Sequence, residues 1–121
     1  MQSAAEAYNA VARQTASPRE LEADLLLKAA SRLQAICDAW DSDKSGLENA
    51  LLYNRKLWAI FMASVTEPDH LLPKETRQNI ANLGIFVMNK TLAMMTDPRP
   101  EHLVSLIDVN RELAAGLRGQ A

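Results

Sequence analysis

The sequence contains little of what marks a secreted, disulfide-stabilised or membrane-spanning protein. Its 121 residues include a single cysteine, four glycines and two each of tryptophan, tyrosine and phenylalanine. Cys37 cannot form an internal disulfide, and its spacing from Leu33 and Trp40 puts it on an inward helix face, which indicates a buried, inert thiol. No apolar run approaches the roughly 18 residues needed to cross a bilayer. We therefore expect no membrane association.

The first residues, MQSAAEAYNAVARQ, also lack the basic and apolar segments of a secretory signal, so we expect a cytoplasmic protein. The formal net charge is -2, with acids and bases interspersed along the chain. Such a chain has no basic stripe with which to hold a phosphate backbone, and direct nucleic-acid binding is disfavoured.

Motifs for catalysis and metal binding are missing as well. The sequence shows no catalytic triad, no phosphate-cradling loop and no paired carboxylates, so we expect neither an enzyme nor a cofactor. Residues 41–52 resemble a calcium loop, but Leu52 occupies the position that requires a bidentate glutamate. His70 and His102 lack the partner spacing of a zinc site. No metal site is expected.

Four helix starts can be recognised as capping boxes or first-turn prolines. A capping box combines a serine N-cap with a glutamate three residues later, and proline is tolerated in a first turn but not in a helix interior. The segments SPRE (17–20) and SGLE (45–48) are capping boxes, and prolines mark two later starts. The residues assigned in this way are Ser17, Pro18 and Glu20; Ser45 and Glu48; Pro73; and either Pro98 or Pro100.

Apolar periodicity agrees with these starts. Residues 47–65 carry one helical stripe, interrupted by Asn54. Residues 80–95 carry two neighbouring stripes, and a helix that is apolar around most of its circumference is either central in the fold or covered by a partner. The second of these stripes is Ala81, Ile85, Met88, Leu92 and Met95.

The predicted fold is all-α, a single-domain helical bundle of four to five helices over residues 1–121. The helices are expected at about residues 3–14, 18–40, 46–65, 74–95 and 100–117. At 48% hydrophobic and 23% charged residues, the composition is that of an ordered globular domain.

Three helix positions break the apolar pattern. Gly84 costs about 1 kcal/mol relative to alanine in a helix, which indicates close helix packing or, alternatively, a hinge or binding notch. Asn54 and Asn110 belong to the similar segments NRKL, NKTL and NREL, for which a hydrogen bond between helices, a ligand site and coincidence are all open. Trp58, Phe61 and Phe86 are most simply core residues. The candidate partner-binding residues are Asn54, Arg55, Trp58, Asn82, Gly84, Phe86, Asn110 and Arg111.

The segments YNRKLW (53–58) and NIANLGIFVM (79–88) strongly resemble the FlaF family of bacterial flagellar biosynthesis regulators. SPRELEADLLLKAASRLQ (17–34) and the preceding AYNAVARQTA (7–16) are similar to the N-terminal part of that family, so the likeness runs over nearly the whole chain. The family supplies no set of functional residues to carry over.

This resemblance implies a small, non-enzymatic cytoplasmic protein that is needed for flagellin production and export. It implies flagellin as a partner and a role opposite FlbT, a repressor of flagellin translation. One expectation is therefore a flagellin-binding chaperone that holds an amphipathic helix in a groove. The alternative is a post-transcriptional regulator of flagellin translation that acts on or against the FlbT repressor without holding flagellin.

Overall fold

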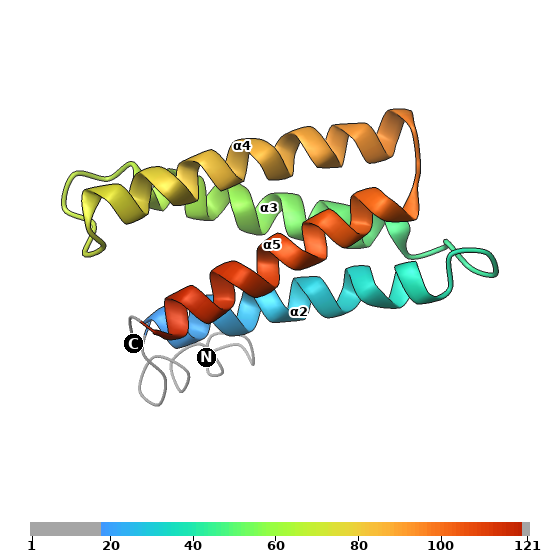
Figure 1. Ribbon diagram of the computed structural model, residues 1–121, viewed down its shortest axis with the longest axis horizontal. Helices are drawn as coiled ribbons and strands as arrows, with labels where there is room; N and C mark the ends of the chain where they lie inside the picture. Colours follow the sequence, from blue (N-terminus) through green and yellow to red (C-terminus); the bar gives the residue numbers. More distant parts are fainter. Residues whose placement is uncertain (1–17, 120–121) are drawn as a thin grey trace, which may run out of the picture.

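The computed structural model describes residues 18–119, which form four helices and no strand. The helices are α2 (Pro18–Asp38), α3 (Leu47–Val65), α4 (Lys74–Thr96) and α5 (Pro100–Arg118). They run up and down in an antiparallel bundle (Figure 1). The all-α prediction is confirmed, and the boundaries of these four helices lie within two residues of those expected. The helix expected at 3–14 lies outside the described residues.

Three of the predicted helix starts coincide with prolines. α2 begins at Pro18, α4 begins directly after Pro73, and α5 has Pro100 in its first turn, which decides between Pro98 and Pro100. A first-turn proline loses no hydrogen bond, because the N–H groups of that turn have no partner within the helix. The predicted cap Ser17 lies outside the described residues.

The start of α3 differs from the prediction. Its N-cap is Gly46 and no side chain caps it, so the capping box of Ser45 and Glu48 is wrong. The Ser45 backbone N–H instead donates to Asp43 Oδ1 at 2.9 Å. This hydrogen bond two residues along the chain is typical of aspartate in a turn. It also holds the pKa of the exposed Asp43 carboxyl below its ordinary value.

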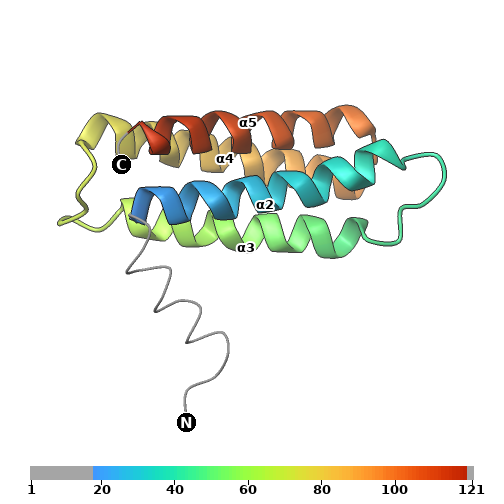
Figure 2. The ribbon, with the colours of Figure 1, turned by 90° about the horizontal axis from the view of Figure 1, so that it is seen from below.

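Helices adjacent in the chain pack on each other, and α5 returns to α2 to close the bundle. Figure 2 shows α2 flanked by α5 and α3, with α4 behind it. The closest packing joins α2 and α5. Alanines are three of the five buried residues of α2 and one of the six of α5, and small side chains allow helix axes to approach. The buried alanines are Ala23, Ala29 and Ala30 of α2 and Ala114 of α5.

The helix α4 packs on α3 and α5 but not on α2. It is therefore not central in the bundle, as one reading of its two apolar stripes had allowed. Its inward side is formed by Ile80, Gly84, Val87, Thr91 and Met94. The second stripe lies beside this buried side, toward the surface.

Candidate functional site

The candidate residues on α3 and α5 form a hydrogen-bonded cluster in the core. Asn110 accepts a hydrogen bond from the Trp58 indole N–H at 2.8 Å. Its Nδ2 donates to Asn54 Oδ1 at 2.7 Å and to the Leu26 carbonyl at 3.3 Å. All three polar side chains are fully buried. Of the readings left open for Asn54 and Asn110, the structure confirms the hydrogen bond between helices.

This polar cluster is closed to a partner. Asn54, Trp58 and Asn110 each have 0% of their surface exposed, so a partner reaches them only if the bundle opens. The cluster joins α2, α3 and α5, which fixes how these helices align. One donor, the buried Asn54 Nδ2, makes no hydrogen bond. The third segment of the sequence pattern has no such role, because Asn89 is exposed.

Gly84 lies where α4 approaches α3. A Cβ placed on this residue would overlap the side chain of Met62, and no glycine of residues 18–119 has positive φ. The close-packing interpretation of Gly84 is therefore confirmed, and the residue has ordinary helical geometry. Gly84 is buried, so it offers no notch at the surface.

Three further candidates outside the core lie on two helices, Asn82 and Phe86 one turn apart on α4 and Arg111 on α5. Phe86 is 38% exposed, and the Lys90 ammonium lies 5.7 Å from its ring centroid. Asn82 is exposed and hydrogen-bonded within α4. Arg111 on α5 donates to Gln34 of α2 at 3.4 Å. The structure places Asn82 and Phe86 on one face of α4 and Arg111 on another helix, and their contact with a partner stays a prediction.

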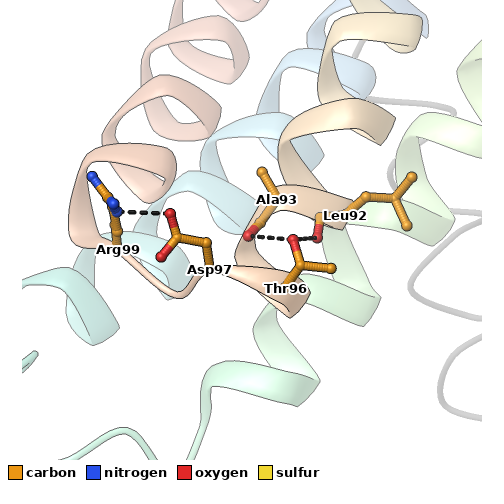
Figure 3. Close-up of polar contacts among 5 residues, drawn as sticks. All are labelled: Leu92, Ala93, Thr96, Asp97 and Arg99. Atoms are coloured by element: carbon orange, nitrogen blue, oxygen red, sulfur yellow. Dashed lines mark hydrogen bonds and ion pairs between the residues drawn. The ribbon is translucent and has the colours of Figure 1, made fainter.

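Three of the four exposed large apolar residues of α4 belong to its second sequence stripe, hereafter the α4 stripe (Ala81, Ile85, Met88, Leu92 and Met95). Ile85, Leu92 and Met95 are 55%, 59% and 67% exposed. Leu92 extends from α4 on the side away from α5 (Figure 3). Large apolar side chains gathered on one face mark an interaction surface more often than scattered ones do. Sequence reasoning identified the stripe but did not place its residues among the candidates.

Beside the α4 stripe, the structure has two adjoining hollows between α3 and α4, hereafter the α3–α4 groove. Their volumes are about 150 and 240 Å³, and they share Arg55, Thr91 and Met95. The Thr91 hydroxyl donates to the Val87 carbonyl at 2.7 Å, so its proton is not free for a ligand. The complete lining is Glu48, Leu51, Leu52, Arg55, Met88, Thr91, Leu92 and Met95.

At one end of the groove, polar contacts fix the turn from α4 into α5 (Figure 3). The Thr96 hydroxyl lies within hydrogen-bond distance of the Leu92 and Ala93 carbonyls, at 3.2 and 3.4 Å. Beyond the helix, Arg99 Nε and Asp97 Oδ2 form an ion pair at 2.8 Å. Both contacts use groups at the helix end and leave the Leu92 side chain free.

Of the eight predicted candidates, only Arg55 lines the groove. The apolar residues of its lining, with Leu52 opposite the α4 stripe, were missed as site residues. For Met88, Leu92 and Met95 the signal was the second stripe itself, which the sequence shows to be apolar without showing which way it faces. Cys37, expected to be buried, is half-buried.

Across residues 18–119, no three histidine, cysteine, aspartate or glutamate side chains lie close enough together to hold a metal ion. None of the four described helices is both long and apolar enough to pass through a membrane.

The family model described as flagellar protein FlaF matches residues 4–117. No curated protein and no solved structure matches. The family match includes all four described helices except the last residue of α5 and covers nearly the whole chain. The chain therefore belongs to the FlaF family of flagellar proteins.

Proposed function

We propose that this protein promotes flagellin synthesis and export as a cytoplasmic, non-enzymatic chaperone that binds flagellin. The observation that carries the proposal is the α4 stripe, an apolar surface that residues 18–119 leave exposed although they form a core of their own. Membership in a family of flagellar proteins supports flagellin as the partner.

A chaperone of this kind needs apolar surface that the folded chain does not bury itself. Amphipathic helices bind such surfaces by laying their apolar face into a groove. The termini of flagellin are expected to be amphipathic helices that polymerise when uncovered, so a surface of this shape suits them. The α3–α4 groove adjoins the stripe and widens the area that a bound helix would cover.

The alternative function is control of flagellin translation through the FlbT repressor, without a flagellin complex. It would use a protein surface as well, because the net charge of -2 does not favour a contact with messenger RNA. The two functions differ in which protein the chain holds.

Co-purification from cells with and without FlbT separates them. We expect the tagged protein to retain flagellin in both strains, and the purified pair to form a complex in size-exclusion chromatography. Retention of FlbT alone would favour the regulatory alternative. If purified flagellin does not bind at tens of micromolar, the chaperone proposal is wrong.

A further inference from the structure

The α3–α4 groove contains one positive charge at its centre. Arg55 lines both hollows, among Met88, Leu92 and Met95. Within residues 18–119 its guanidinium forms no ion pair, hydrogen bond or ring contact. Most exposed arginines are simply solvated, but this one lies where any molecule filling the hollows would exclude water from it. Such a molecule has to supply a partner for the charge.

The helix α4 offers no acidic residue near the centre of the groove that could pair with Arg55. Between Arg77 and Asp97 this helix has Lys90 as its one ionisable residue, and Lys90 lies over the Phe86 ring rather than in the groove. Glu48 lines the first hollow only, seven residues before Arg55 on α3, or about 10 Å along the helix axis. Among residues 18–119, an acidic group is therefore missing beside Arg55.

The apolar side of the groove has the spacing of a helix partner. The α4 stripe steps by four, three, four and three residues and spans about 21 Å. Side chains spaced in this way interdigitate with a second helix that carries the same spacing. The surface is thus shaped for a helix of about four turns.

We propose that the α3–α4 groove binds one amphipathic helix of the partner, with its apolar stripe on the α4 stripe and a carboxylate at the edge of that stripe paired with Arg55. The groove takes a helix with an acidic flank and rejects one with a basic flank. This inference rests on the proposed function only for the identity of the natural partner, which is then an acid-flanked helix of flagellin.

A second copy of the chain fits the groove less well. Its own α4 stripe is flanked by no acidic residue, since residues 78–96 contain neither aspartate nor glutamate. Pairing two α4 stripes would leave both copies of Arg55 without a carboxylate from the facing helix. Charge complementarity therefore favours a different chain.

The test uses two synthetic peptides, independent of flagellin. Both are 18-residue helices with leucines at four-and-three spacing; one has glutamates along the edge of the stripe and the other has lysines at the same positions. We expect the wild-type protein to bind the glutamate peptide at least tenfold more tightly in fluorescence anisotropy. The acidic protein as a whole attracts the lysine peptide, so this preference cannot come from net charge.

Arg55→Glu should reverse the preference, and Lys56→Glu, which makes the same charge change on an exposed neighbour outside the lining, should leave it unchanged. Leu92→Glu should weaken binding of the glutamate peptide at least tenfold. Val104→Glu, at an exposed apolar residue on α5, is its control. Circular dichroism melts check that each variant is folded. If Leu92→Glu does not fold, Arg55→Glu still tests the proposal.

Methionine methyl NMR locates the peptide. Signals of Met88 and Met95 should shift on binding, while that of the buried Met94 on the same helix should move least.

Absence of binding, equal binding of both peptides, or an unchanged preference in Arg55→Glu would overturn the inference. If wild-type protein retains flagellin but fails these peptide tests, the chaperone function stands without this groove. If the peptides behave as expected but flagellin is not retained, the groove serves a different partner.

Discussion

The α2–α5 pair and the α3–α4 pair use their apolar residues differently. α2 and α5 pack closely, with three alanines on the buried side of α2, and Val104 is the one large apolar residue that they expose within the described chain. α3 and α4 expose six: Leu52, Ile60, Ile85, Phe86, Leu92 and Met95. The α2–α5 pair buries nearly all of its large apolar side chains in the core, whereas the α3–α4 pair leaves several of them exposed. The exposed large apolar side chains of the four helices are therefore concentrated on the α3–α4 side of the bundle.

The exposed polar contacts between α2 and α5 add little to the stability of this pair. Arg118 pairs with Asp24 at 2.6 Å, with both side chains about half exposed. Pairs of this kind contribute about 0 to 1 kcal/mol, because water and salt screen them. The close pair is stabilised mainly by what it buries.

Truncating one leucine in each helix pair, Leu26 of α2 and Leu92 of α4, should give the largest difference in the free energy of unfolding. Leu26→Ala removes a fully buried side chain of α2 and should lower the free energy of unfolding by about 2 to 5 kcal/mol. Leu92→Ala on the α4 stripe should change it by less than about 0.5 kcal/mol. Urea denaturation of both variants measures this. Equal losses would mean that the α4 stripe is buried in solution.

The buried polar cluster offers the next largest effect. Asn110→Leu leaves the Trp58 N–H and the Asn54 carbonyl oxygen without partners, at about 1 to 3 kcal/mol for each buried group. Asn54→Leu should cost less, because it also removes the unpaired Nδ2 and leaves Asn110 bonded to Trp58 and Leu26. Thermal melts of the two variants should rank them in this order. The reverse order would show that Asn54, not Asn110, organises the cluster.

Gly84 tests how closely α3 and α4 approach. Gly84→Leu should destabilise the free protein by about 1 to 3 kcal/mol, because the added side chain overlaps Met62. Gly84→Ala should be close to neutral, since the half-buried Met62 can move and alanine gains about 1 kcal/mol of helix propensity. A Gly84→Leu protein with an unchanged melt and lost flagellin binding would instead assign this position to the partner site.

The smallest effect concerns a half-buried carboxylate of α2. Burial raises the pKa of Glu22, and the ion pair with Arg19 at 2.9 Å only partly opposes this. The folded state therefore binds this proton more tightly than the unfolded state, and stability falls as pH rises from 4.5 through the raised pKa. Glu22→Gln should raise the melting temperature by one or two degrees at pH 7. The gain should disappear below pH 4.5; a gain that persists there would have another cause.

Local sequence signals predicted the helices because caps, prolines and periodicity act within one or two turns. They failed at Ser45, whose backbone N–H could donate to the carboxylate of either Glu48 or Asp43. In the structure it donates to Asp43. They also could not orient α4, because both of its stripes are apolar and only the positions of α3 and α5 decide which is covered. The pairing of Asn54 with Asn110 spans 56 residues, so no local pattern could contain it.

The link between Asn110 and Leu26 has a consequence for synthesis on the ribosome. The two residues are 84 positions apart, so the contact cannot form until nearly the whole chain has emerged. Before then, the Leu26 carbonyl and the Trp58 N–H lack their Asn110 partner, and α2 lacks its closest neighbour. A growing chain that ends before α5 can form the contacts of α3 with α2 and α4, but it lacks every contact that α5 makes with α2 and α4. Closure of the core is a late, post-elongation event, and premature termination before residue 100 yields a chain that cannot complete it.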